Sequence, residues 1–575
     1  MAVQKPTLPK GTRDFGPADV QKRKYILNTI ETVFKKYGFM PLETPTMENL
    51  STLEGKYGEE GDKLLFRILD SGDYFKDVKG QFLRDAKLVN FFTSFCKYFL
   101  SWIFEHSDLK IRTDHFMIYK WFDSGFPLFE NSLNNSLQNF NEVEAKCIKE
   151  VFKDYRLFVA IEARHFGEQN RDVDLDNFET YKELYVERFR DQIMPQLIDG
   201  IITSLPSKIT TKSISEKGLR YDLTVPFARY VVMHRNEITF PFKRYQMQPV
   251  WRADRPQKGR YREFWQCDAD VVGSDSLLNE LDLIQIYDEA FTQLGIKNYE
   301  IKINNRKVLA GIAEVVKSID VMNNIAVAID KLDKIGEEGV RKELVEQGFS
   351  EAELNTLFSI ITIKGENKEI LNQLKGKLQS SQEGLKGIEE LAFILASNPN
   401  HTINLTLDFS LARGLSYYTG CIFEVVSNDG TLKSSIGGGG RYDNLTGIFG
   451  LPNVSGVGIS FGLDRIYDVM EELKLFPEQL RATSTQVLFC HFDEATQLYC
   501  LPALKALRDA GIAAEVFPDN KKLGKQLDYA NALQIPFAAI AGETEMQQQV
   551  FTVKNLITGE QQTCTVQALI SLVGQ

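Results

Sequence analysis

The chain has 575 residues, which is enough for three or four domains of about 150 residues each. Hydrophobic residues make up 43% and charged residues 25% of it, which is ordinary globular usage and excludes a wholly disordered, collagenous or disulfide-stapled chain. The formal net charge of −11 argues against a general nucleic-acid coat, although locally clustered basic residues could still bind nucleic acid.

The cysteines and the N-terminal residues bear on cellular location. Seven cysteines are scattered without CxxC spacing, so we expect reduced thiols rather than disulfides or a zinc site. Residues 1–15 lack the apolar segment of a secretory signal, and no run of about 18 apolar residues predicts a membrane span. We therefore expect a cytoplasmic protein.

The N-terminal third contains two contrasting segments. Apolar residues at helical spacing predict a helix over 18–37, and an extended segment with two prolines follows over 39–47. Residues 74–210 differ from their surroundings because 25 of these 137 residues are aromatic. We interpret this stretch as an inserted helical subdomain with an aromatic core, and its histidines and cysteines fit no metal-ligand spacing.

Strands and helices alternate in the rest of the chain. We predict strands over 219–225, 242–251, 261–273 and 299–304, and a helix over 276–294. The Lys- and Glu-rich residues 306–400 indicate a helical accessory module. Strands resume over 403–408, 419–427 and 433–438, and a helix starts near Gly462. Strand–helix alternation over 485–575 predicts a small α/β domain.

A basic segment lies between two of the predicted strands. Its charged members within eleven positions are Arg252, Arg255, Lys258, Arg260 and Arg262. Guanidinium groups on such a loop can bind polyphosphate oxygens, and Phe264 can stack on a base. Gln266, Asp268 and Asp270 alternate along the second strand and therefore share one face, which suits a small zwitterion. The competing interpretation is a solvated hairpin.

Three further segments contain residues suited to ligand binding. In LARGLSYYTG, Arg413 lies beside a glycine and precedes a tyrosine pair. The glycines 437–440 before Arg441 would let the backbone approach a ligand, although glycine runs also occur in plain turns. In GISFGLDRI, Arg465 lies one turn into a predicted helix, where a surface position is the alternative. No Walker-type phosphate loop is present.

In this order, the segments resemble the motifs of class II aminoacyl-tRNA synthetases, and among them the histidyl-tRNA synthetase family. The helix ending in KKYGFMPLETPTME is similar to the first motif, with Pro45 at the motif position. WRADRPQKGRYREFWQCDAD and GISFGLDRI are similar to the second and third motifs. LARGLSYYTG and GGGGRYD resemble segments specific to the histidine enzymes, although Ser416 stands where Asp is usual. GTRDF and LRYDLTVPFARY also look like that family, and the resemblance covers about 1–70 and 212–575.

The resemblance implies an α+β catalytic domain, in which an antiparallel sheet is flanked by helices. This domain would comprise 1–73, 211–305 and 401–475, interrupted by the 74–210 insertion and by the helical module 306–400. Residues 485–575 would form an α/β anticodon-binding domain. That segment has six Lys/Arg and nine Asp/Glu, so its charge gives no independent support for RNA binding; Lys521, Lys522 and Lys525 are its local basic cluster.

The resemblance also implies an activity. L-Histidine would be activated with ATP to histidyl-adenylate, and histidine would then be transferred to the 3′-terminal adenosine of tRNA(His). Arg252 and Arg413 would be catalytic, Mg²⁺ would bridge the outer phosphates without dedicated protein ligands, and a homodimer would form through the first motif. The implied ATP-binding residues are Arg252, Arg260, Arg262, Phe264 and Arg465.

The implied histidine-binding residues are Asp222, Thr224, Gln266, Asp270, Tyr417, Tyr418 and Tyr442. Among them, Asp222, Thr224 and Gln266 would bind the α-ammonium group, and Asp270 and Tyr418 would bind the ring nitrogens. Two other functions remain possible: a non-catalytic histidine-sensing regulatory subunit related to the synthetases, or an RNA-binding module with an inactive synthetase domain. Retention of Arg252, Arg413 and Arg465 favours the enzyme.

Overall fold

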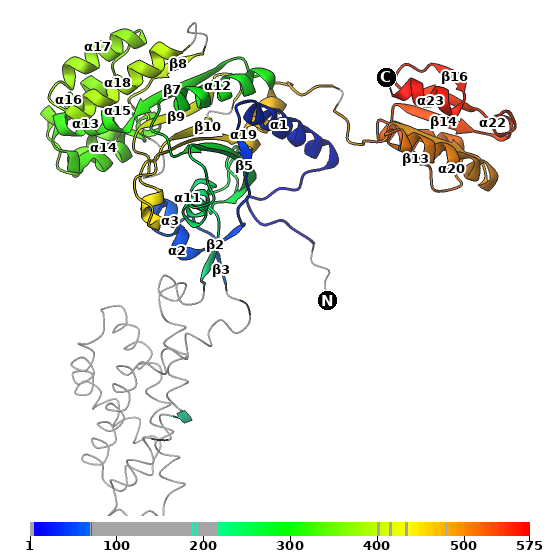
Figure 1. Cartoon of the computed structure of the whole chain (residues 1–575), viewed down its shortest axis with the longest axis horizontal. Coiled ribbons are helices and arrows are strands. Elements are labelled where there is room, and N and C mark those ends of the chain that lie inside the picture. Colours follow the sequence, from blue (N-terminus) through cyan, green and yellow to red (C-terminus); the bar gives the residue numbers. More distant parts are fainter. Residues whose placement is uncertain are drawn as a thin grey trace, which may run out of the picture. The chain divides into compact units, whose positions relative to one another are not determined.

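The computed structural model describes residues 5–69, 71, 187, 191–192, 215–398, 403–412, 417–431, 435–478 and 480–574 (Figure 1). The predicted insertion over 74–210 lies almost entirely outside these residues, as do Arg413 and Ser416. Two compact units make up the chain. One comprises Met1–Thr46, Thr52–Leu65 and Arg220–Gln575, and the other comprises Met47–Ser51 and Phe66–Leu219. The finer six-part domain division stays a prediction.

An eight-stranded mixed sheet forms the centre of the first unit. Its order is β1 (Met40–Pro41), β5 (Phe242–Trp251), β6 (Glu263–Val272), β11 (Gly456–Gly462), β10 (Ser435–Arg441), β9 (Cys421–Ser427), β7 (Tyr299–Asn305) and β8 (Leu405–Leu407). The inner pairings are antiparallel, whereas β1–β5 and β7–β8 are parallel. The strand predicted over 242–251 is β5, and its hairpin with β6 carries the basic loop.

Helices α1 (Pro17–Lys36), α12 (Leu278–Gln293) and α19 (Leu463–Glu472) pack against this sheet (Figure 1). The helical spacing of apolar residues in α1 places Ile30 and Phe34 on its buried face. Phe34 lies 5.8 Å from the Phe461 ring of β11, and Phe461 lies 4.7 Å from Tyr287 of α12. These aromatic contacts join the first motif to the strand that leads into the third.

The strand predicted over 219–225 is wrong. Strand β4 (Lys217–Leu219) ends at the first residue of this segment, and helix α11 begins within the segment and covers Thr224–Met233. The Asp222 carboxylate accepts a hydrogen bond from the Val225 backbone N–H at 3.2 Å, which satisfies a donor in the first helical turn. Pro226 is tolerated there because first-turn N–H groups need no helical partner. Asp222 and Thr224 therefore lie at a helix start, not on a strand.

The glycine run 437–440 forms most of strand β10 rather than a turn. A Cβ atom at Gly439 would lie 2.2 Å from the Gly458 carbonyl oxygen, and one at Gly437 would lie 2.7 Å from the Tyr287 ring. Side chains are therefore excluded by neighbouring strands and by α12. The glycines let β10 fit between β9 and β11 with helices close to its face.

Residues 306–398 form the predicted helical module. Its helices are α13 (Arg306–Val316), α14 (Met322–Ile329), α15 (Leu332–Glu346), α16 (Glu351–Ile361), α17 (Asn367–Lys377) and α18 (Gln382–Ser397). Helices α13 and α18 pack closely because Gly311 lies against Gly384; a Cβ atom at Gly311 would lie 2.6 Å from the Gly384 Cα. Helix α18 also contacts β7 and β9, which joins the module to the central sheet.

A three-stranded sheet is formed by β2 (Met47–Asn49), β4 and β3 (Arg67–Ile68), in the order β2-β4-β3. Ile68 pairs with Lys217 across β3 and β4, and the Ser215 hydroxyl donates a hydrogen bond to the Ile68 carbonyl oxygen at 2.7 Å. The two flanks of the segment 70–214 therefore lie side by side. The short helices α2 (Leu50–Leu53) and α3 (Gly58–Asp62) follow β2 in the chain.

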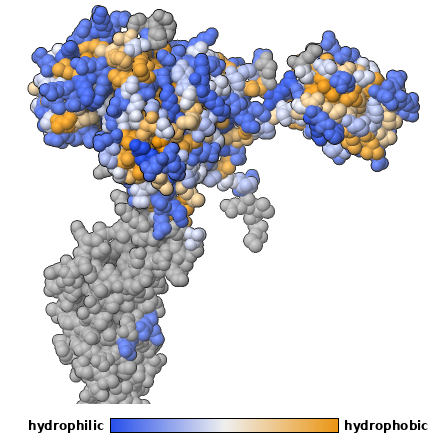
Figure 2. Space-filling view, viewed as in Figure 1, coloured by the Kyte–Doolittle hydropathy of each residue, from blue (hydrophilic) through white to orange (hydrophobic). Residues whose placement is uncertain are grey.

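The C-terminal residues form the predicted α/β domain. The sheet order is β13 (Ala514–Val516), β12 (Val487–His491), β14 (Phe537–Ala541), β15 (Phe551–Asn555) and β16 (Gln561–Cys564). The helices are α20 (Glu494–Asp509), α21 (Leu523–Ala532), α22 (Glu543–Gln548) and α23 (Val566–Val573). Figure 2 shows apolar side chains among hydrophilic ones on this domain. Leu498 and Leu501 of α20 are exposed.

Within the described part of the chain, no helix combines the length and apolar character needed to cross a membrane.

Candidate functional site

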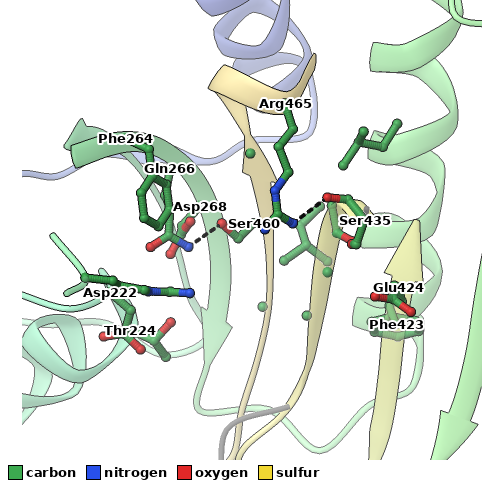
Figure 3. Close-up of a pocket in the computed structure, with 18 of the residues that line it drawn as sticks. Asp222, Thr224, Phe264, Gln266, Asp268, Phe423, Glu424, Ser435, Ser460 and Arg465 are labelled. Carbon is green, nitrogen blue, oxygen red and sulfur yellow. Dashed lines mark hydrogen bonds between the residues drawn. The ribbon is translucent and has the colours of Figure 1, made fainter. Parts of the chain in front are cut away.

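A cavity of about 380 Å³ opens at the central sheet (Figure 3). Its lining comes from the start of α11, from the β5–β6 hairpin, from β9, β10 and β11, and from the first turn of α19. This size lies within the range of small-molecule sites in proteins. The four segments that the sequence singles out for chemistry thus converge on one cavity.

Three buried aspartates line one part of the cavity. Asp222, Asp268 and Asp270 are each 2% exposed. Burial raises the pKa of Asp222, and the nearby Arg252 lowers it in part. Burial likewise raises the pKa of Asp270, against the opposing effect of Arg244. Burial raises the pKa of Asp268 to about 8, where Arg244 acts to lower it and Asp270 to raise it further. A cationic group bound here would stabilise the ionised form of these carboxylates.

The expected common face of β6 is confirmed, because Gln266, Asp268 and Asp270 all line the cavity. Gln266 donates a hydrogen bond through Nε2 to the Ser460 hydroxyl of β11 at 2.8 Å. The Asp270 carboxylate accepts a hydrogen bond from the Tyr442 hydroxyl at 2.5 Å. Arg244 lies 2.8 Å from the other oxygen of Asp270 in a fully buried ion pair.

Tyrosines close the same part of the cavity. Asp222 accepts hydrogen bonds from the hydroxyls of Tyr57 at 3.0 Å and Tyr417 at 3.1 Å. Tyr418 also lines the cavity, with its ring 5.1 Å from Tyr417. Burial raises the pKa of Tyr418 above its ordinary value, so its hydroxyl stays protonated and can donate a hydrogen bond.

Arginines line another part of the cavity. The Arg252 guanidinium lies 4.2 Å from the Tyr221 ring centre and 5.2 Å from that of Phe264, and its Nε donates to the Tyr221 carbonyl oxygen at 3.1 Å. Arg260 belongs to the same hairpin loop and has a side chain that is 45% exposed. These two arginines and Arg465 contribute positive charge to one enclosed space.

Arg465 projects from the first turn of α19 into the cavity (Figure 3). Its Nε donates to the Gly259 carbonyl oxygen at 2.9 Å, and one terminal nitrogen donates to the Ser435 carbonyl oxygen at 2.6 Å. Burial lowers its pKa to about 10, and repulsion from Arg252 and Arg260 acts in the same direction. A polyphosphate anion would relieve this repulsion while Arg465 remains charged at neutral pH.

Arg262 is not among the residues that line the cavity. Its Nε donates to the Asp254 carbonyl oxygen at 3.1 Å, and its backbone N–H donates to the Gly11 carbonyl oxygen at 2.8 Å. Gly11 fits tightly there, because a Cβ atom would lie 2.8 Å from Arg262 Cγ. In the described structure Arg262 thus fastens the hairpin loop to the N-terminal segment.

The N-terminal segment also contacts α19. Arg13 and Arg23 both form ion pairs with the buried carboxylate of Asp464, which also accepts the Trp265 backbone N–H at 2.9 Å. The Arg13 guanidinium lies 3.5 Å from the centre of the Tyr261 ring. These contacts join the N-terminal segment to the residue before Arg465 and to the hairpin loop.

The described residues contain no group of three or more His, Cys, Asp or Glu side chains positioned to hold a metal ion. Glu424 of β9 is a carboxylate in the cavity lining, facing the same space as Arg465 and Ser435 (Figure 3). One carboxylate suits Mg²⁺ that is held mainly by substrate phosphates and water.

Comparison with known proteins decides the family. Residues 205–466 match the family described as histidyl-tRNA synthetase, and residues 485–575 match the anticodon binding domain. A histidine–tRNA ligase of Flavobacterium johnsoniae is 46% identical over 562 residues, covering 97% of both chains. One of Phocaeicola vulgatus is 44% identical and covers 99% of both. The chain belongs to the histidyl-tRNA synthetase family.

A solved structure confirms the fold of this histidyl-tRNA synthetase family member. The histidyl-tRNA synthetase of Nostoc sp. PCC 7120 superposes with a TM-score of 0.65 at 24% identity, covering 100% of this chain and 99% of that one. The predicted class II catalytic fold with a C-terminal anticodon-binding domain is thereby confirmed.

Two lining residues, Glu424 and Ser460, were not predicted, nor were Tyr57 and Arg244, which contact the lining residues Asp222 and Asp270; Asp268 was predicted only as part of the polar face of its strand. Asp268 carried a signal, because it lies between two predicted site residues on one strand face. Arg244 faces Asp270 across the β5–β6 pair, and this register is set by the hairpin rather than by local pattern. The predicted catalytic Arg413 lies outside the described residues.

Proposed function

We propose that this chain is a histidine–tRNA ligase. It activates L-histidine with ATP to histidyl-adenylate and transfers histidine to the 3′-terminal adenosine of tRNA(His). The observation that carries the proposal is a single cavity in which three arginines lie near three buried aspartates. Such a site can bind a polyphosphate and a cationic amino acid side by side, in a chain whose relatives over nearly its full length are histidine–tRNA ligases.

Histidine occupies the aspartate part of the cavity. Its α-ammonium group lies at Asp222, Thr224 and Gln266, which combine a carboxylate with hydrogen-bond acceptors. Asp270, Tyr418 and Tyr442 form the end that receives the imidazole ring, and Tyr417 holds Asp222 in place. A site that hydrogen-bonds ring nitrogens rejects amino acids lacking them by a factor of about 10⁴–10⁵, so no editing domain is needed.

ATP occupies the arginine part. Arg252 contacts the α-phosphate and the carboxylate of histidine, since it lies between the two parts of the cavity. Arg465 and Arg260 bind the outer phosphates, and Phe264 and Arg465 enclose the adenine. Arg262 contributes to ATP binding by holding the hairpin loop that carries Arg260. The family resemblance implies a contact of Arg413 with the α-phosphate, although Arg413 lies outside the described residues.

The first step forms a bond between a carboxylate oxygen of histidine and the α-phosphorus, and pyrophosphate leaves. Negative charge develops on the α-phosphate oxygens, and preorganised guanidinium groups stabilise it. Glu424 lies in the cavity lining with Arg465 and would help to hold Mg²⁺ on the outer phosphates, where the ion would neutralise charge on the leaving group. In the second step the ribose hydroxyl of the terminal adenosine attacks the histidyl carbonyl carbon, and AMP leaves.

The remaining partners follow from the family and from the surface. The C-terminal domain contacts the tRNA anticodon, with Lys521, Lys522 and Lys525 as its basic cluster. The chain is a cytoplasmic homodimer that pairs through the first motif. Support for this pairing comes from β1, which is a two-residue edge strand of the central sheet in which Met40 is 50% exposed.

The regulatory-subunit alternative is not favoured. Arg252 and Arg465 are present and face one cavity, and the C-terminal domain is present. A protein that only senses histidine would not need an arginine-lined cavity for a polyphosphate.

Pyrophosphate exchange tests the proposal. Purified protein should incorporate labelled pyrophosphate into ATP only when L-histidine is present. Arg252→Ala should reduce this exchange by about 10²–10³-fold, because one preorganised charge donor is lost. Exchange that does not depend on histidine, or none at all in folded wild-type protein, would refute the assignment. Charging of tRNA(His) transcript then tests the second step.

A further inference from the structure

Arg220 is a fully buried arginine outside the cavity lining. Its Nε donates a hydrogen bond to the Pro249 carbonyl oxygen at 2.8 Å, and one terminal nitrogen donates to the Thr44 carbonyl oxygen at 2.7 Å. The same terminal nitrogen donates to Gln248 Oε1 at 2.9 Å and to the Pro45 carbonyl oxygen at 3.3 Å. One guanidinium group therefore joins the first motif to the last residues of β5.

The backbone of Arg220 adds two further links. Its N–H donates to the Thr46 carbonyl oxygen at 3.0 Å, and its carbonyl oxygen accepts the Trp251 N–H at 3.1 Å. The Arg220 guanidinium also lies 5.7 Å from the centre of the Trp251 ring. Side chain and backbone together fix this residue relative to the end of β5, one position before Arg252.

Tyr221 follows Arg220 and holds the proposed catalytic residue Arg252. Arg252 Nε donates to the Tyr221 carbonyl oxygen at 3.1 Å, and its guanidinium lies 4.2 Å from the centre of the Tyr221 ring. Arg220 is linked to both partners of this contact, because Tyr221 is its own covalent neighbour and Trp251 is that of Arg252. A shift of Arg220 would therefore move the two partners relative to each other.

The chemistry of arginine suits this role. Its planar guanidinium group carries five N–H donors in a fixed arrangement, so it can bind carbonyl oxygens of two segments at a set separation. A lysine at position 220 would have a single flexible ammonium group and would hold the two segments less tightly. Burial of a charged group is costly unless it is hydrogen-bonded, and these carbonyl oxygens supply the hydrogen bonds.

We propose that Arg220 is a positioning residue for Arg252, whose guanidinium it aligns with the α-phosphate through Tyr221 and the end of β5. The inference rests on the proposed function, since it depends on the catalytic role of Arg252. Arg220 does not line the cavity, so it acts without touching the reactants.

Arg220→Lys tests the inference in histidine-dependent pyrophosphate exchange. The variant keeps the charge and loses the planar donor group, so kcat should fall by about 10–100-fold, the cost of a small displacement of a catalytic group. The KM values for histidine and ATP should change by less than about threefold, because the charge that Arg252 stabilises develops in the transition state. Arg235→Lys is the control and should match wild type, since Arg235 is exposed and lies 4.6 Å from the Phe240 ring centre.

A double-mutant cycle with Arg252→Ala separates positioning from a general structural loss. If Arg220 acts through Arg252, Arg220→Lys should lower kcat/KM by less than about twofold in the Arg252→Ala background. Arg441 is a matched buried arginine that pairs with Glu280 at 2.6 Å, on β10 and α12. Arg441→Lys should therefore change kcat/KM by the same factor in the wild-type and Arg252→Ala backgrounds.

The cycle can also overturn the inference. An equal loss from Arg220→Lys in both backgrounds would do so, because that pattern indicates a structural role. A folded Arg220→Lys with kcat within about twofold of wild type, or a loss that lies in the KM values instead, would also overturn it. If Arg220→Lys does not fold, Gln248→Leu, which removes one acceptor of the same guanidinium group, decides by the same criteria. Wild-type protein without histidine-dependent exchange would instead refute the proposed function itself.

Discussion

Gly458 shows how closely the pocket constrains single residues. A Cβ atom here would lie 2.0 Å from Oδ1 of Asp270, the oxygen that the Tyr442 hydroxyl binds. Gly458→Ala should therefore displace Asp270, raise the KM for histidine and lower the free energy of unfolding by about 1–3 kcal/mol. Histidine-dependent exchange and urea unfolding measure the two effects.

Gly447 offers a matched control for this substitution. It lies in the short helix η6 (Thr446–Phe449), and a Cβ atom would lie no nearer than 3.7 Å to its closest neighbour. Gly447→Ala should leave both measurements unchanged. Equal effects of the two substitutions would contradict the steric explanation.

Titration of Asp268 makes stability depend on pH. Its pKa is raised by burial to about 8, whereas an unfolded aspartate has a pKa of about 3.9. Between these values the native state binds more protons than the unfolded state, so this group's contribution to stability falls as pH rises. Asp270, Asp222 and Arg244 face the same carboxyl and set the size of the effect.

Asp268→Asn does not titrate. Relative to wild type, this variant should therefore be more stable to unfolding at about pH 8.5 than at about pH 5. Urea unfolding of both proteins at the two pH values measures this difference. A constant difference across that range would show that Asp268 ionises normally in the folded protein.

At the scale of elements, the N-terminal segment supports the ATP part of the cavity from outside. Arg13 does not line the cavity, but it contacts two residues that do. Arg13 pairs with Asp464 beside Arg465 and stacks on Tyr261 of the hairpin loop. Arg13→Ala should lower kcat/KM for ATP by up to about 100-fold, because small displacements of positioned groups are costly. The KM for histidine should stay within about twofold of wild type, since the aspartates lie on other elements.

Lys22→Ala is the control for Arg13. Lys22 joins α1 to α19 through a partly exposed ion pair with Glu471, which contributes little. It should leave both kinetic constants unchanged. Parallel losses for ATP and histidine in Arg13→Ala would indicate general unfolding rather than positioning of the loop.

The elements also show what local sequence can and cannot predict. Strand β5 has the predicted bounds because its β-prone residues end at clear turn signals. Residues 219–225 were misassigned because the side chain of Asp222 satisfies a helical donor that no periodicity reveals. Eleven predicted site residues line the cavity, because the motifs name them directly. Arg262 does not line it, and the contact of its backbone with Gly11 could not be predicted because it joins residues far apart in the sequence.

At the scale of the whole molecule, the pairing of β3 with β4 makes the segment 70–214 removable. Because Ile68 and Ser215 are hydrogen-bonded neighbours, a short linker can replace that segment without moving either strand. The deletion variant should keep histidine-dependent exchange within about tenfold, since loop length affects closure entropy only weakly.

Exchange and tRNA charging should be measured in parallel on this deletion variant. Loss of exchange in folded protein would show that the segment supports the histidine pocket. Loss of tRNA charging alone would assign it a role in RNA binding.

The edge position of β1 bears on assembly. If the chain pairs through its first motif, light scattering at micromolar concentration should give twice the mass of the 65.5 kDa chain. Met40→Lys, which charges the exposed edge strand, should weaken this association. A fully active monomer would contradict the proposed homodimer.

The parallel pairing of β1 with β5 also constrains synthesis on the ribosome. Met40 pairs with Arg244, which is translated 204 positions later. At 5–20 residues per second this interval lasts about 10–40 s. The apolar face of α1, with Ile30 and Phe34, emerges long before β5, β6 and α12 exist to cover it. The nascent chain therefore presents an uncovered hydrophobic helix for tens of seconds, which makes it a client for chaperones that bind at the ribosome exit.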